Sequence, residues 1–102
     1  MKNGFDLEWT FEAEQNLNSI FDYLEEVWTE REISNFAKKL ESNLQIISLY
    51  PTLFPYCNKE KSVRRCVMSS QTTIYYRDIQ IDKKIVIITL FDNRSNPKSL
   101  KL

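Results

Sequence analysis

The sequence contains no histidine, one glycine and two cysteines among its 102 residues. Without histidine it lacks the commonest general base and the usual partner of a nucleophilic serine or cysteine, so any chemistry must use Lys, Arg, Tyr, Asp or Glu. A single glycine excludes the glycine-rich loops that bind phosphates and dinucleotides. Two thiols without C-x-x-C spacing argue against structural zinc. We therefore expect neither a metal nor a cofactor.

Long apolar runs are also missing. No segment approaches the roughly 18 uninterrupted apolar residues of a membrane span, and the beginning of the chain, MKNGFDLEWTFEAE, has no apolar signal region. We therefore expect a cytoplasmic protein with no membrane partner, in which Cys57 and Cys66 are reduced and Cys66 lies in the core. The length and the 42% hydrophobic content predict one domain over residues 1–102.

Net charge is zero, but the charges are segregated along the chain. Residues 1–37 contain two bases and nine acids, whereas residues 38–102 contain twelve bases and five acids. The two parts therefore carry formal charges of −7 and +7. They produce opposite electrostatic fields, which influence the choice of binding partner more than they influence the fold.

The first half of the chain has two helical patterns after a short strand. Phe5 to Trp9 alternates apolar and acidic residues, as a half-buried strand does. Thr10 can cap a helix over Phe11 to Trp28, whose apolar residues recur at helical spacing. Thr29 to Glu32 has the form of a capping box, so a second helix begins almost at once and continues to Tyr50-Pro51. So short a link predicts an antiparallel helical hairpin.

The second half has the two-residue period of strands. After an irregular loop over Pro51 to Ser62, the predicted strands are Val63 to Met68, Thr72 to Ile81 and Lys84 to Phe91, with a hairpin turn at Asp82-Lys83. The last strand is nearly continuous in apolar residues, which predicts an inner strand buried on both faces. The fold class is α+β in the order β-α-α-β-β-β, with the hairpin on one face of a mostly antiparallel sheet.

Basic and aromatic residues gather on these strands and at their ends. They are Lys59, Lys61, Arg64, Arg65, Tyr75, Tyr76, Arg77 and Arg94. Adjacent strand residues point to opposite faces, so either Arg64 or Arg65 faces the side without helices, and Tyr76 and Arg77 are separated in the same way. Such a face suits nucleic-acid phosphate or an acidic protein segment. Alternatively, these bases pair with acids of the first helix.

The stretch LFDNRSNP, residues 90–97, ends the last strand and has two interpretations. Asp92 and Asn93 can bond to the backbone and Asp92 can hold Arg94 in a salt bridge, which would close the strand. Alternatively, Arg94 is a working residue, because the end of a buried strand is a well-ordered place for one. The residues alone leave both interpretations open.

Several stretches together carry a family resemblance over essentially the whole chain. They are AEQNLNSIFDYL, PTLFP, VRRCV, IYYR and LFDNRSNP. The chain resembles the RelE/ParE superfamily, the toxins of bacterial type II toxin-antitoxin (plasmid stabilisation) modules, whose fold has the element order predicted above. The resemblance implies a growth-arresting toxin, a cognate acidic antitoxin as partner and a toxin-antitoxin heterotetramer.

Within this superfamily RelE-like members cut mRNA on the ribosome without metal, and ParE-like members inhibit DNA gyrase. As a nuclease, the chain would use Tyr76 or a lysine to deprotonate a ribose 2′-OH, with Arg94 and Arg65 stabilising the developing negative charge. Thr72-Thr73 and Ser99-Leu100 stand where RelE-like nucleases have an arginine and a tyrosine, which favours gyrase inhibition.

Target binding is assigned to a further set of residues. These are Lys59, Lys61, Arg64, Arg77 and Asn93. A third possibility is a degenerate toxin whose basic face only binds the antitoxin.

Overall fold

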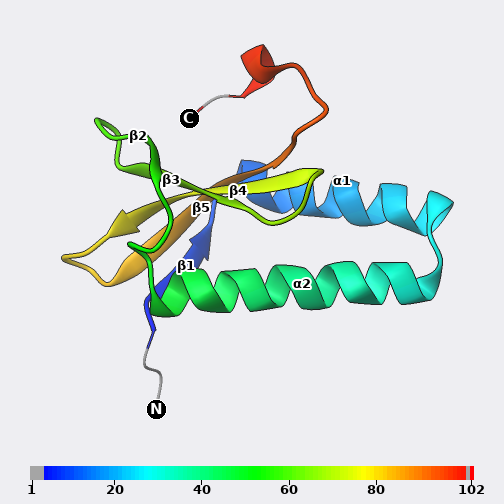
Figure 1. The fold of residues 1–102 in the computed structure, drawn as a ribbon, viewed down its shortest axis with the longest axis horizontal. Coiled ribbons are helices and arrows are strands. Elements are labelled where there is room, and N and C mark those ends of the chain that lie inside the picture. The colour runs from blue at the N-terminus through cyan, green and yellow to red at the C-terminus, as the bar shows by residue number, and fades with distance from the viewer. Residues whose placement is uncertain (1–3, 101) are drawn as a thin grey trace.

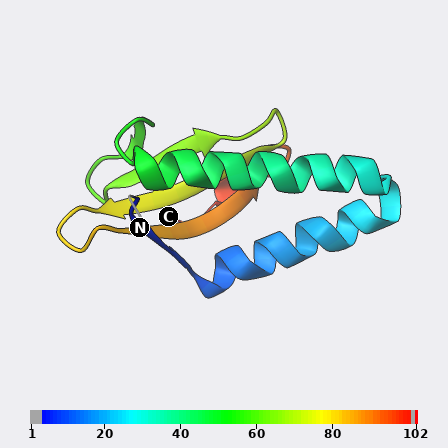
Figure 2. The same ribbon diagram turned by 90° about the horizontal axis from the view of Figure 1, so that it is seen from below.

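The computed structural model describes residues 4–100 and 102. The elements are β1 (Asp6–Trp9), α1 (Phe11–Val27), α2 (Glu30–Leu49), β2 (Tyr56–Asn58), β3 (Val63–Val67), β4 (Thr72–Ile79), β5 (Lys84–Asp92) and the 3-10 helix η1 (Pro97–Ser99). The sheet order is β1-β5-β4-β3-β2; β1 is parallel to β5 and the other pairs are antiparallel. Both helices lie on one face of the sheet (Figure 1, Figure 2), which confirms the predicted α+β class.

The predicted caps set the helical hairpin. Thr10 Oγ1 accepts from Ala13 N at 3.0 Å and donates to Ile88 O at 2.8 Å, which ties the start of α1 to β5. Thr29 and Glu32 form the capping box, with each backbone N–H bonded to the other side chain at 3.3 Å. Because only Trp28 and Thr29 separate the helices, α2 must run back along α1.

The main core lies between the helices and the sheet. Its fully buried members include Ala13 and Ile47 from the helices and Cys66, Ile74, Tyr76, Ile85 and Ile87 from the strands. The expectation that the last strand is buried on both faces is wrong. Ile85 and Ile87 are fully buried, but Val86 and Ile88 of the same strand are half-buried, because the helices cover only one face. β4 is the most buried strand.

Two strand predictions also need correction. The predicted loop Pro51 to Ser62 contains β2, a three-residue edge strand that pairs with β3 through a bulge. So short a strand has no detectable period, and Pro55 stands directly before it. β4 ends at Ile79, not Ile81; the turn takes residues 80–83, and Ile81 is 92% exposed at its tip.

The segment after β5 crosses to the other side of the sheet. Asn96 caps η1 by accepting from Lys98 N at 3.0 Å. Figures 1 and 2 agree in placing η1 on the face of the sheet away from α2. The sheet is therefore covered by the hairpin on one face and partly by this C-terminal segment on the other.

The two cysteines are free, as expected. Cys57 is exposed, and Cys66 is buried, with its Sγ donating to Asn43 Oδ1 at 3.3 Å. Burial raises the pKa of Cys66 to about 11.

Among the described residues, no helix combines the length and the apolar character needed to cross a membrane.

Candidate functional site

The end of β5 holds the acid and the guanidinium of the LFDNRSNP stretch in one compact turn. Asp92 Oδ1 accepts from the backbone N and the Nε of Arg94 at 2.9 and 3.0 Å, and Asp92 Oδ2 accepts from Arg94 Nη2 at 3.0 Å. The hydrogen bond from Arg94 lowers the pKa of Asp92, and the same bond raises the pKa of Arg94. Asp92 therefore closes the strand and neutralises Arg94, whose side chain stays 59% exposed.

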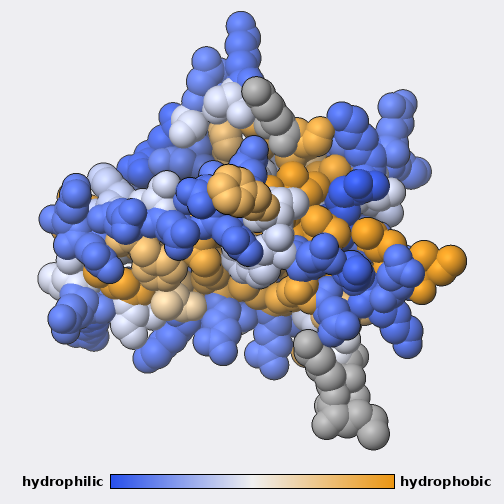
Figure 3. Space-filling model, turned by 180° about the vertical axis from the view of Figure 1, so that it is seen from behind, coloured by the Kyte–Doolittle hydropathy of each residue, from blue (hydrophilic) through white to orange (hydrophobic). Residues whose placement is uncertain are grey.

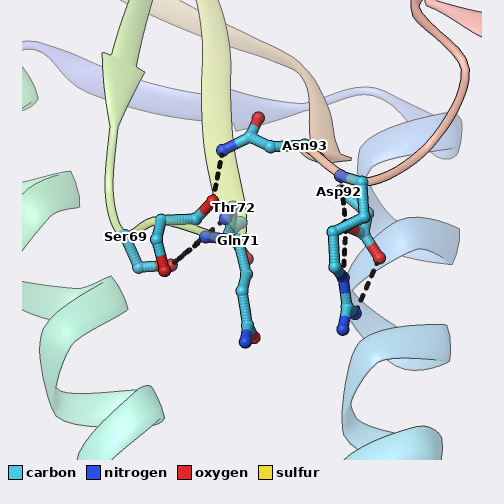
Figure 4. Close-up of polar contacts among 7 residues, drawn as sticks. Ser69, Gln71, Thr72, Asp92 and Asn93 are labelled. Atoms are coloured by element: carbon cyan, nitrogen blue, oxygen red, sulfur yellow. Dashed lines mark hydrogen bonds and ion pairs between the residues drawn. The ribbon is translucent and has the colours of Figure 1, made fainter.

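Asn93 joins the end of β5 to the β3–β4 turn. Its backbone N donates to Gln71 O at 2.8 Å, its Oδ1 accepts from Thr73 Oγ1 at 2.7 Å, and its Nδ2 reaches Ser70 O at 3.4 Å. Figure 4 shows Asn93 extending toward this turn, in which Ser69 Oγ accepts from the Gln71 and Thr72 backbone N–H groups. These contacts give the Asn93 side chain a structural role, and its assignment to target binding stays a prediction.

A cleft of about 630 Å³ opens beside this turn, between α1, the end of β5 and the C-terminal segment. We call it the hairpin cleft. Its lining includes Glu12, Ile20, Tyr23, Trp28, Phe36, Phe91, Asp92, Arg94 and Leu100. A second groove of about 330 Å³ shares Trp28 and Phe36 with it and continues under the start of α2 toward Met68. The sequence did not single out the aromatic residues that the helical hairpin contributes to this lining, because their spacing does not distinguish them from core residues.

Two predicted site residues lie in the interior, so their assignments are corrected. Tyr76 has no exposed surface, and its hydroxyl donates to Pro51 O at 2.7 Å. Burial raises its pKa far above the usual range, so it cannot serve as an accessible base. Arg64 is buried on the same face as Tyr76, and its Nε donates to Asp78 Oδ1 at 3.0 Å. The reason is the alternation of strand residues, which brings Arg64 and Tyr76 to the face of the sheet that carries the helices, where the chain after α2 also contacts both residues.

The other predicted bases are exposed. Arg65 and Arg77 belong to the opposite face of β3 and β4, as the alternation predicted, and Lys59 and Lys61 lie in the β2–β3 loop. Lys61 Nζ donates to Leu102 O at 3.0 Å, so the C-terminal segment reaches this loop. We call Lys59, Lys61, Arg65 and Arg77 the basic face.

Pairing with acids of the first helix, the alternative explanation of these bases, is not seen in the described part of the chain. The ion pairs found there join Arg64 to Asp78, Lys84 to Glu8, and Arg94 to Asp92. None of them involves α1. Nor do the described residues contain a group of three or more His, Cys, Asp or Glu side chains that could hold a metal ion.

Comparison with known proteins identifies the fold. No protein-family model and no curated protein sequence matches the chain. A solved structure of the chromosomal ParDE TA system from P. aeruginosa is similar at 14% identity, with 89% of this chain and 98% of that chain covered and a TM-score of 0.70. A metal-bound toxin from Helicobacter pylori is similar at 9% identity, 87% and 94% coverage and a TM-score of 0.52. The chain therefore has the RelE/ParE-like toxin fold, as its sequence predicted.

Proposed function

We propose that this chain is the toxin of a toxin-antitoxin module and that it arrests growth by binding DNA gyrase without cutting a substrate. Support for the first part is the fold it shares, at a TM-score of 0.70, with a structure from a ParDE system. Support for the second part is the position of the three residues that RNA cleavage would need. They do not meet at one point.

Cleavage by a ribose 2′-OH needs a base and a positive charge within about 3 Å of one reacting group. Tyr76 is buried under the helices, whereas Arg65 belongs to the opposite face of the sheet. Arg94 lies beyond the end of β5 and is neutralised by Asp92. In the sheet register Arg65 lies opposite Tyr75, and Asp92 lies opposite Thr72. The distance along β4 between Tyr75 and Thr72 is about 10 Å, so Arg65 and the end of β5 are at least that far apart.

The basic face supplies the target-binding surface in this proposal. Its four side chains are exposed, and none of them pairs with an Asp or Glu side chain in the described part of the chain, although Lys61 is bonded to Leu102 O. Unpaired arginines and lysines bind an acidic protein surface or DNA phosphate, and their contribution weakens as salt rises. Arg94, which the nuclease interpretation makes catalytic, is in this proposal a target-binding candidate beyond the end of β5, because more than half of its side chain remains accessible.

The partner in this proposal is an antitoxin encoded beside the toxin, with an acidic segment that covers the basic face, and the complex is a heterotetramer. The similar structure from P. aeruginosa is that of a ParDE TA system, which supports a partner of this kind. Co-expression with the neighbouring small reading frame tests it. We expect co-purification at a defined mass and restored growth; growth arrest that persists despite a stable complex would contradict it.

The gyrase assay tests the target. Purified chain should block supercoiling of relaxed plasmid, and Arg65→Glu should raise the half-inhibiting concentration about five- to tenfold, equivalent to ~1–1.4 kcal/mol of binding free energy. Lys38→Glu is the matched control, because Lys38 is also an exposed base but lies on α2, away from the basic face. Normal supercoiling at saturating chain would overturn gyrase as the target.

A parallel translation reaction tests the RelE-like alternative. If the purified chain cuts messenger RNA on translating ribosomes and the Arg65→Glu variant leaves it intact, ribosome-dependent cleavage would replace the gyrase proposal. Expression without the antitoxin covers the remaining alternative. Normal growth with abundant folded chain would identify a degenerate toxin.

A further inference from the structure

The hairpin cleft has the character of a docking groove. Its walls combine aromatic and aliphatic surface from both layers of the fold with polar side chains, among them the buried Thr72 and Thr89. Tyr23 is half-exposed on the α1 wall, beside Arg94, and Leu100 closes the cleft from the C-terminal segment. Phe36 of α2 packs edge-on against Phe21 with ring centroids 5.7 Å apart, so the hairpin that forms the cleft is well supported.

The charge of α1 indicates what kind of segment fits. This helix contains five acids and no base: Glu12, Glu14, Asp22, Glu25 and Glu26. None of them takes part in an ion pair within residues 4–100 and 102. The face that α1 and β1 present has apolar side chains reaching the surface between hydrophilic ones (Figure 3). A groove that offers apolar surface beside an unneutralised acidic helix favours an amphipathic, cationic partner.

The charges inside the cleft point the same way. Glu12 lines it from the first turn of α1, and Asp92 lines it from β5. Arg94 is a basic residue in this lining, but its Nε and Nη2 already donate to the Asp92 carboxylate. The continuing groove adds Glu32 and Lys39, which offset each other. An acidic segment would therefore meet net repulsion here, in contrast to the basic face.

We infer that the hairpin cleft binds an amphipathic segment of a partner protein, with apolar side chains in the cleft and lysines or arginines against the acids of α1. This surface is separate from the basic face and has the opposite charge preference. The inference does not depend on the growth-arrest target. Its test uses purified chain and no toxicity measurement, so it can fail or succeed independently of the proposed function.

The test uses three synthetic helical peptides. The first has leucines at i, i+3, i+4 and i+7 with lysines between them, the second has glutamates in place of the lysines, and the third has serines in place of the leucines. Trp28 lines both the cleft and its continuation, so its fluorescence reports binding in a Trp9→Phe background that leaves it as the sole tryptophan. We expect binding of the lysine-leucine peptide alone, and weaker binding as salt rises.

Two variants and a matched control show whether the peptide binds in the hairpin cleft. Glu12→Gln should weaken binding of the lysine-leucine peptide about 1.5- to 5-fold, the range of an exposed ion pair, and Tyr23→Ser should weaken it about 5- to 30-fold by removing an aromatic contact. Glu14→Gln should weaken binding less than Glu12→Gln does, because Glu14 shares the first turn of α1 but does not line the cleft.

Three results would overturn the inference. The first is equal or tighter binding of the glutamate peptide, and the second is equal effects of Glu12→Gln and Glu14→Gln. The third is concentration-dependent self-association in sedimentation that Tyr23→Ser abolishes, since the occupant of the cleft would then be a second copy of this chain. Far-UV circular dichroism of each variant shows that the fold is retained, and Tyr23 is exposed enough for its replacement to leave the core intact.

Discussion

Replacing Arg64 should destabilise the fold strongly, although an arginine among the other basic residues of the strands suggests a role in target binding. Its side chain is 9% exposed, and that of Asp78 is 3% exposed. Besides the Asp78 contact, Arg64 Nη1 donates to Phe54 O at 2.7 Å, and its guanidinium carbon lies 3.8 Å from the centre of the Tyr56 ring. Arg64 therefore fastens β3 to β4 and to the chain that leads into β2.

The expected magnitude follows from what remains after the change. Arg64→Met leaves the Asp78 carboxylate buried with Gln80 Nε2 as its remaining side-chain partner, at 2.8 Å. Breaking a buried ion pair from one side costs about 3–5 kcal/mol, because the other charge stays uncompensated. That is a large share of the ~5–15 kcal/mol by which a domain of this size is stable. Replacing both partners, as in Arg64→Met with Asp78→Leu, should recover most of the loss.

Urea unfolding at pH 7, followed by far-UV circular dichroism, measures the effect. The control is Arg65→Met, the neighbouring residue on the exposed face, which should change the free energy of unfolding by less than about 0.5 kcal/mol. A double-mutant cycle over Arg64 and Asp78 gives their coupling energy. If Arg64→Met costs less than about 1 kcal/mol, or if the double variant is no more stable than the single one, the structural role assigned to Arg64 is refuted.

The other predictions concern the Tyr76 hydroxyl, the thiols of Cys57 and Cys66, and the Asp92 carboxylate. Tyr76→Phe should lower the free energy of unfolding by about 0.5–1.5 kcal/mol through one lost hydrogen bond and leave growth arrest intact; loss of toxicity in a stable variant would restore its catalytic assignment. A thiol reagent at pH 8 should modify Cys57 in the folded chain and Cys66 only in urea, because Cys66 is buried with a pKa of about 11. Arg94 lowers the pKa of Asp92 in the folded state, so the carboxylate stabilises the fold above its ordinary pKa and this stabilisation is lost as pH falls through the lowered value. Asp92→Asn should therefore unfold at lower urea at pH 7 than the unmodified chain, and the difference should vanish in acid; a constant difference would contradict this.

Local chemistry made the helices predictable. Thr10 and Thr29 each have a hydroxyl at the position where a helix needs a cap, and the structure uses both. The alternation of strand residues correctly placed Arg64 and Arg65 on opposite faces. It could not say which face the helices cover, because that depends on how the hairpin docks. For this reason the sequence points to Tyr76 and Arg64 as site residues, although both side chains are buried on the face that carries the helices.

The hairpin cleft could not be predicted from the sequence for a related reason. Ile20 falls on the apolar stripe of α1 and Trp28 follows its end, where core packing and an open groove have the same spacing. Only the relative placement of α1, β5 and the C-terminal segment decides which of the two occurs. The Asp92–Arg94 contact is local and was anticipated, but its consequence was not. A neutralised Arg94 leaves the lining of the cleft acidic rather than basic.

The segregation of charge along the chain becomes a segregation in space, and this constrains any partner that covers both surfaces. The acidic helix α1 forms one wall of the hairpin cleft, with Glu12 in its lining, whereas Arg65 and Arg77 of the basic face lie on the other side of the sheet. A uniformly acidic antitoxin segment would be attracted by the second surface and repelled by the first. A partner that occupies both must therefore carry basic and acidic residues in separate stretches, as this chain does. Exchanging the charges of those two stretches in the partner should abolish binding while leaving its composition and net charge unchanged.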